Sequence, residues 1–193
     1  MKAMILLSKD YEETEAVAVI DILRRAEIDI DVVATEGDLD TVGDHNITIR
    51  ADYLLEDIKG ADYDIVITPG GVGGTNALRE NAKVIDLLKE QYQSDSGYIA
   101  SICASPRVLD KAGISQEIRG TIFPALSDQV TFKEYVADEI VVNDQDHRVI
   151  TSQGPATAYY FALEIVRQLK GQEVHDQVAK ALLIPNVEAA VNA

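Results

Sequence analysis

Cys103, the only cysteine of the chain, lies between an apolar run at residues 98–102 and a segment with helical spacing at 104–112. A cysteine at such a strand-to-helix junction has the placement of a nucleophile elbow, a sharp turn that lifts the reactive atom above a sheet. Amides at the start of the following helix favour the thiolate, so we expect a lowered thiol pKa. A buried, inert cysteine is the alternative, because free cysteine is among the most buried residue types.

A second turn, Pro69-Gly70-Gly71, follows another apolar run at residues 64–68. Glycines at such a turn let the backbone approach a ligand closely. The amides of Gly71 and Ala104 can together hold a developing oxyanion, whereas a plain strand-to-helix turn is the alternative. A phosphate loop of the Walker type is not supported, because its lysine and its spacing are missing.

Three glutamates, Glu12, Glu13 and Glu15, crowd the first strand-to-helix turn. Acidic residues suit a helix N-terminus, which explains each of them without any chemistry. One of them can instead turn inward, where burial raises its pKa and lets it donate a hydrogen bond to a thiolate.

These turns are positioned by short β-branched runs that alternate with longer segments of helical spacing. The alternation predicts an α/β fold with a parallel sheet covered on both faces, and a site beyond the carboxyl ends of its strands. We expect strands at residues 3–7, 28–34, 64–68, 98–102, 121–123, 140–142 and 149–151, and helices at 13–26, 81–93, 104–112, 155–170 and 173–183.

The composition, 47% hydrophobic and 26% charged, is that of a globular protein, and 193 residues suit one domain. A net charge of −16 repels phosphate backbones and anionic membranes, so we expect no nucleic acid and no membrane as partner. No apolar run approaches the ~20 residues that cross a bilayer, and the short apolar start predicts no signal peptide. A single thiol suits a reducing, cytoplasmic compartment and excludes a zinc site built on several thiolates, so we expect no metal.

Taken in order, the motifs resemble those of the ThiJ/PfpI superfamily, in the branch of the Parkinson-disease-associated protein deglycase and its bacterial relatives. The resemblance runs from residue 2 to about residue 183, and it implies one ThiJ/PfpI domain over residues 1–193. The implied fold is a flavodoxin-like three-layer α/β/α sandwich with a mostly parallel central sheet, as in class I glutamine amidotransferases. The motifs that carry the resemblance are Glu12-Glu13-Thr14-Glu15, Pro69-Gly70-Gly71 and Ile102-Cys103-Ala104-Ser105-Pro106.

The resemblance implies a reactive, oxidation-sensitive Cys103 on a strained elbow, with a protonated Glu15 hydrogen-bonded to its sulfur. It also implies that Arg25 lies near the site and the dimer contact, and that Ser105, where relatives have glycine, can cap the helix. The implied protein is a stress-response homodimer that needs no cofactor and reacts with a small α-oxoaldehyde or a peroxide. Family activities include conversion of methylglyoxal to lactate, deglycation of glycated proteins and oxidation of the cysteine to sulfinate. The binding groups expected around the sulfur are Gly70, Gly71, Ala104, Ser105 and Arg25.

The chain departs from the family pattern at one position. The family places a histidine before a proline at the strand end that faces the cysteine, and this chain has Phe123 there. The histidines that it does contain, His45, His147 and His175, are expected on the surface. Loss of a general base costs about 10²–10⁴-fold in rate, so we expect weak or absent glyoxalase activity and no peptidase activity.

Three functions remain open. An enzyme would add Cys103 to the aldehyde carbon of an α-oxoaldehyde. A redox sensor would let peroxide oxidise the same sulfur and needs no histidine, so Phe123 favours it. A chaperone-like scaffold would act through its surface without turnover.

Overall fold

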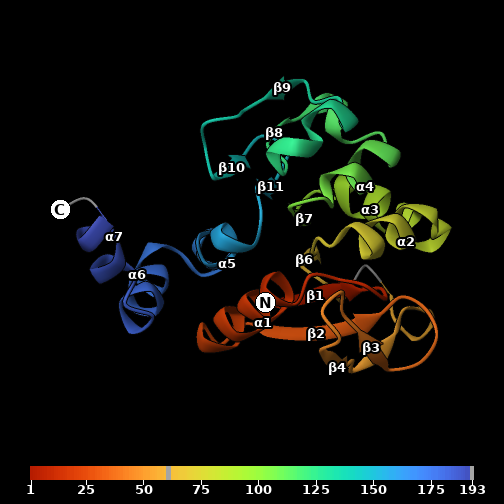
Figure 1. Cartoon of the computed structure of the whole chain (residues 1–193), viewed down its shortest axis with the longest axis horizontal. Helices are drawn as coiled ribbons and strands as arrows, with labels where there is room; N and C mark the ends of the chain where they lie inside the picture. Colours follow the sequence, from red (N-terminus) through yellow and green to blue (C-terminus); the bar gives the residue numbers. More distant parts are fainter. Residues whose placement is uncertain (60–61, 192–193) are drawn as a thin grey trace.

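A seven-stranded sheet lies between two layers of helices in the computed structural model, which describes residues 1–59 and 62–191 (Figure 1). Its strands are β1 (Lys2–Leu7), β2 (Asp29–Ala34), β5 (Tyr53–Leu54), β6 (Ile65–Thr68), β7 (Tyr98–Ile102), β10 (Val141–Asp144) and β11 (Val149–Ser152). They follow the order β10-β11-β7-β6-β1-β2-β5, and every neighbouring pair is parallel except β10 with β11. Two small sheets stand apart, the antiparallel hairpin β3 (Asp40–Val42) with β4 (Thr48–Arg50) and the parallel pair β8 (Arg119–Gly120) with β9 (Glu134–Tyr135).

The helices cover both faces of the sheet because its central strands are apolar on both sides. Successive residues of a strand point to opposite faces. Ile5 of β1 therefore packs in one apolar cluster with Val19 and Phe161, whereas Met4 packs in the other with Val108. The helices are α1 (Glu13–Arg25), α2 (Val72–Glu80), α3 (Ala82–Gln93), α4 (Pro106–Lys111), α5 (Ala158–Lys170), α6 (Gln172–Ala181) and α7 (Ile184–Val191).

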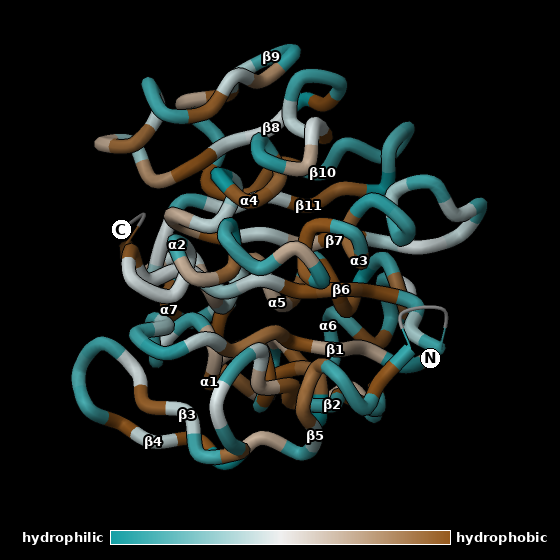
Figure 2. The backbone as a smooth tube through the Cα atoms, turned by 90° about the vertical axis from the view of Figure 1, so that its right-hand side faces the viewer, coloured by the Kyte–Doolittle hydropathy of each residue, from teal (hydrophilic) through white to brown (hydrophobic). Residues whose placement is uncertain are grey.

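Helices α1, α5 and α6 thus lie on one face of the sheet, and α2, α3 and α4 lie on the other. Figure 2 shows the apolar strands in brown through the middle of the molecule. Each fully buried aliphatic or aromatic side chain contributes about 1.5–3 kcal/mol to folding. The expected flavodoxin-like α/β/α sandwich is confirmed. Among the described residues, no helix combines the length and the apolarity needed to span a bilayer.

Three expectations about elements were wrong. Residues 121–123 form no strand, because the Thr121 amide donates to the Thr151 side chain and the Phe123 amide donates to the carbonyl of the Cys103 turn. Helix α2 was missed because Gly73 and Gly74 are poor helix formers, yet Gly74 packs so tightly that a Cβ there would lie 3.0 Å from the Tyr11 backbone. The helix expected at 173–183 ends earlier, and α7 continues the chain after Leu183, whose φ is 61°.

Candidate active site

Cys103 makes the sharp turn expected of a nucleophile elbow. Its φ of 62° lies in the left-handed region, which costs an L-residue roughly 1–2 kcal/mol. Two backbone bonds hold it there, since its amide donates to Ser152 O at 2.9 Å and its carbonyl accepts from Phe123 N at 3.0 Å. The side chain is half-buried, so the sulfur is neither sealed in the core nor fully exposed. The helix after the turn begins at Pro106 rather than at 104, because the residues between them form the turn itself.

Ser105 does not cap helix α4 with its hydroxyl, contrary to expectation. The hydroxyl points to the sheet instead, 2.7 Å from Thr68 O and 2.9 Å from Ile102 O, either of which can accept its proton. It also lies 2.8 Å from Ser101 Oγ and accepts from Ile102 N. This fully buried cluster fastens the elbow to β6 and β7. The sequence feature that could have indicated this cluster is a small polar residue near the end of each of these two strands, Thr68 in β6 and Ser101 in β7.

Glu15 is the glutamate that turns inward, and it is completely buried in the first turn of α1. Its Oε2 accepts from Gly70 N at 2.7 Å, whereas its buried Oε1 has no hydrogen-bond partner of ordinary geometry in the described chain. A Cβ at Gly70 would lie 2.5 Å from Glu15 Oε2 and 2.6 Å from Cys103 Cβ. The carboxyl and the cysteine therefore meet only because residue 70 is glycine. The pKa of Glu15 is raised to about 8, mainly by burial, with contacts to Gly70 N and the thiol acting in the opposite direction.

The thiol pKa is raised, which corrects the expectation that the following helix lowers it. Burial is the largest cause, and the negative charge of Glu15 is the next. The amides of Ala104 and Gly71 both face the sulfur and act in the expected direction, but they do not outweigh burial. Because the two acids are coupled, their protons leave in two steps that belong to the pair rather than to either residue, and the first step has a pKa of about 8.

Gly71 and Ala104 are thus brought together beside the sulfur, from two different turns. Gly71 has φ 86° and precedes helix α2. A Cβ there would overlap the Asp10 carbonyl oxygen and lie 2.7 Å from Glu12 N, so only glycine allows this backbone path. Two amides that converge on the sulfur of Cys103 have the arrangement of an oxyanion hole.

Phe123 lies at the rim of the site, where the family histidine was expected. A Cβ on Gly154 would lie 3.4 Å from the Phe123 ring and 4.0 Å from the Cys103 sulfur, so both side chains flank Gly154. The ring is 40% exposed. His147 and His175 lie elsewhere, paired with neighbouring aspartates.

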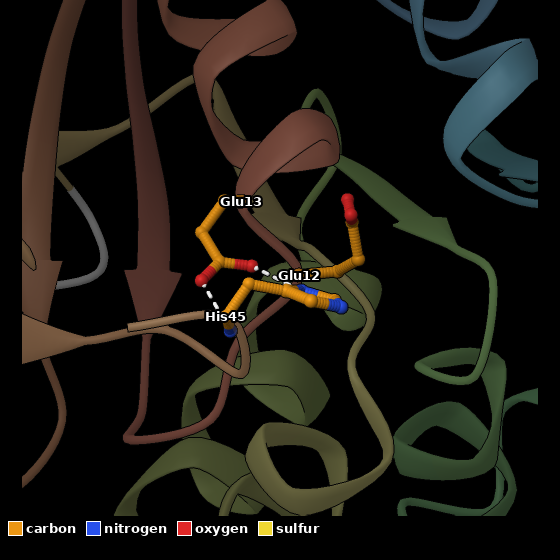
Figure 3. Close-up of side chains that lie close together, drawn as sticks. All are labelled: Glu12, Glu13 and His45. Atoms are coloured by element: carbon orange, nitrogen blue, oxygen red, sulfur yellow. Dashed lines mark hydrogen bonds and ion pairs between the residues drawn. The ribbon is translucent and has the colours of Figure 1, made fainter. Parts of the chain in front are cut away.

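The other two glutamates have structural roles. Glu12 accepts from Glu15 N at 2.7 Å and caps α1. Glu13 is buried and fixes the turn between β3 and β4, since its carboxylate accepts from His45 N at 2.6 Å and contacts His45 Nδ1 at 3.0 Å (Figure 3). Burial alone would raise the Glu13 pKa, but the bonds from His45 outweigh it and lower the pKa.

Glu12, Glu13 and His45 also place their possible ligand atoms within 4.8 Å of one another. An ion bound there would have to compete with the bonds that Glu12 makes to the helix and Glu13 makes to the hairpin. These bonds account for the cluster without a metal. Sequence reasoning missed it because His45 is 32 residues from Glu13.

Arg25 is not brought to the cysteine within this chain. It follows Glu15 by ten residues along α1, which is ~15 Å of helix. Its side chain pairs with Asp21 at 2.7 Å. A place for Arg25 at the dimer contact therefore stays a prediction.

Comparison with known proteins identifies the family of the chain. The sequence model of the DJ-1/PfpI family matches residues 1–168. Protein dj-1beta of Drosophila melanogaster is 40% identical over 183 residues, which cover 94% of this chain and 96% of that protein. Glutathione-independent glyoxalase DJR-1.2 of Caenorhabditis elegans is 37% identical over 185 residues, which cover 94% and 96%. The crystal structure of Drosophila melanogaster DJ-1beta matches the fold with a TM-score of 0.89 at 39% identity, over 94% of this chain and 97% of that one. The resemblance found in the sequence is therefore confirmed, and the chain belongs to the DJ-1/PfpI family.

Proposed function

We propose that the protein is a stress-response protein in which Cys103 adds to the aldehyde of a small α-oxoaldehyde such as methylglyoxal, or to glycated targets, with Glu15 moving the protons. The observation that carries the proposal is the convergence of a buried carboxyl and two amides on one half-buried sulfur. The name of the glyoxalase from Caenorhabditis elegans supports the same chemistry.

The first step needs no cofactor. The sulfur bonds to the aldehyde carbon while the carbon–oxygen π bond breaks and the Glu15 carboxylate takes the thiol proton. The amides of Gly71 and Ala104 stabilise the oxygen as its charge develops, and the oxygen is then protonated to give a hemithioacetal.

The later steps are an internal redox exchange that needs no external oxidant. Glu15 removes the proton from the former aldehyde carbon and returns a proton to the neighbouring carbon, so that the first is oxidised to a thioester and the second reduced to an alcohol. Water then cleaves the carbon–sulfur bond and releases lactate and the thiol. A protonation pKa of about 8 for Glu15 lets one group give and accept protons near neutral pH.

The test is lactate formation from methylglyoxal by the wild type, Cys103→Ser and Glu15→Gln. Turnover that both substitutions abolish, in variants that unfold at the wild-type temperature, supports the proposal. Glu56→Gln is the matched control, because Glu56 is exposed on a short turn away from the site. Turnover that persists in Cys103→Ser contradicts the proposal.

Phe123 favours a second candidate, a redox sensor. The sulfur would attack one peroxide oxygen, breaking the O–O bond and giving sulfenate and water, and a second peroxide would give sulfinate. A gain of about 32 Da on Cys103 after mild peroxide, without any lactate formation, supports the sensor. If neither reaction occurs and Cys103 resists alkylation in the native protein, the protein is a scaffold.

We also propose that the protein is a homodimer. Val17 of α1 and Tyr159 of α5 are apolar side chains that remain 48% and 43% exposed. The two helices pack against each other, so both side chains belong to the same helical layer. Light scattering at several concentrations measures the mass, and a monomer throughout contradicts this proposal.

A further inference from the structure

Arg107 is a buried cation that pairs with no carboxylate among the described residues. It lies in helix α4, four residues after Cys103, and only 6% of it is exposed. Its Nε donates to Ala104 O at 3.2 Å and its Nη1 donates to Gln129 Oε1 at 3.3 Å. Its Nη2 is buried and has no hydrogen-bond partner among the described residues. A buried guanidinium is normally paired, because burying an unpaired charge is costly.

A second arginine lies close to it. Arg79 is near the end of helix α2, and α2 packs beside α4 (Figures 1 and 2). Its Nε is also buried without a partner within residues 1–59 and 62–191. Burial and then the positive charge of Arg79 lower the pKa of Arg107, so the two guanidinium groups are near enough to repel each other. No ion pair neutralises either group in the described part of the chain, although the protein as a whole has a net charge of −16.

The pair is also coupled to the cysteine turn. Arg107 bonds to the carbonyl of Ala104, and the amide of the same residue faces the sulfur. Negative charge on Cys103 acts to raise the pKa of Arg107, against the net lowering, so the guanidinium lies within electrostatic reach of the sulfur.

We propose that Arg107 and Arg79 bind a small oxyanion, a carboxylate or a phosphate group, beside the cysteine turn. An oxyanion accepts hydrogen bonds from the Nη2 of one arginine and the Nε of the other, and its negative charge offsets the repulsion between the two like charges. Water can accept the same bonds but carries no charge. The planar fork of arginine suits carboxylate and phosphate oxygens, which is why arginine predominates at such sites. This inference goes beyond the proposed function, because anion binding is measured without turnover.

The test is the thermal unfolding midpoint of the full chain in sodium formate and in sodium phosphate, against sodium chloride at equal ionic strength. A ligand that binds only the native state raises the midpoint as its concentration passes its dissociation constant. We expect a rise in formate if the site takes carboxylates, and in phosphate if it takes phosphates. Equal midpoints in all three salts overturn the proposal.

Arg107→Gln is the decisive variant. It should lose the anion-dependent rise, and its midpoint in chloride should be at least that of the wild type because an unpaired buried charge is gone. Arg167→Gln is the matched control, since Arg167 already pairs with Glu164 at 2.7 Å on α5, and it should keep the rise. If Arg107→Gln does not fold, Arg79→Gln at the less buried position serves instead and should lose most of the rise. An anion-dependent rise that survives in the arginine variants overturns the proposal.

Discussion

Phe123 donates its backbone amide to the carbonyl of Cys103 at 3.0 Å, and its ring flanks Gly154 on the side where the sulfur also lies. Residue 123 is therefore held in register with Cys103 by the backbone, whatever its side chain. At the position where the resemblance implies a histidine, the chain has a group that cannot accept a proton. The proposed reaction therefore assigns proton transfer to Glu15.

The first prediction concerns this position. Phe123→His should raise Cys103-dependent lactate formation by about 10²-fold, because the backbone bond holds an imidazole at the rim and general bases contribute on that order. The ring is 40% exposed, so the substitution should cost little stability. The measurement is initial rate against methylglyoxal concentration, with Phe123→Leu as control. A histidine variant no faster than the leucine variant would show that the rim position takes no part in proton transfer.

The second prediction concerns the pH dependence of the thiol. The rate of Cys103 alkylation by iodoacetamide should rise with pH and level off near 8, because the first proton leaves the coupled pair there. In Glu15→Gln the break near pH 8 should disappear, and the thiol pKa should fall, since the charge and contact of Glu15 both raise it. The exposed Glu56→Gln should keep the wild-type profile. A break that survives in Glu15→Gln assigns it to another group.

The third prediction concerns stability. Glu15 has a folded-state pKa raised from 4.5 to about 8, so the folded protein holds its proton more tightly than the unfolded chain. The contribution of the Glu15 carboxyl to the free energy of unfolding is fully present below about pH 4.5. It is lost as the pH rises through about 8. The full difference in the Glu15 pKa between the unfolded and folded states corresponds to roughly 5 kcal/mol of unfolding free energy. Urea unfolding from pH 5 to 9 should therefore show a decline in the wild type that is absent from Glu15→Gln, and parallel curves for the two proteins would refute the assignment.

The sequence predicted the parallel sheet and the elbow well, because both follow from local patterns. The run before Cys103 is apolar and the residues after it are small. The local pattern alone did not identify which glutamate turns inward, since all three suit a helix start, and Glu15 was named only through the family resemblance. A helical pattern was available: Glu15 is spaced four and seven residues from the buried Val19 and Ile22, and so shares their face.

Other features depended on the assembled fold. The Cys103 thiol pKa is raised because elements far apart in the sequence bury the thiol. No local sequence pattern indicates this burial. The apolar run at residues 121–123 looked like a strand, but Thr121 N bonds to the side chain of Thr151 rather than to a strand backbone, so no ladder forms. The sequence did not predict that Arg107 pairs with no carboxylate among the described residues. The pairing depends on where carboxylates from distant parts of the chain lie in the folded protein.

The last prediction concerns the glycine that brings its amide to the sulfur. Gly71→Ala should destabilise the fold by about 3 kcal/mol, because a Cβ at φ 86° is strained and overlaps the Asp10 carbonyl. Gly37→Ala is the control, since Gly37 also has a positive φ of 70° but a Cβ there meets nothing within 4 Å. It should cost only about 1 kcal/mol of backbone strain. Urea unfolding measures both, and any Gly71→Ala protein that still folds should alkylate Cys103 more slowly, because relief of the overlap moves an amide away from the sulfur. Equal losses of stability in the two variants would mean that backbone conformation alone, and not the close approach of the Asp10 turn, requires glycine at residue 71.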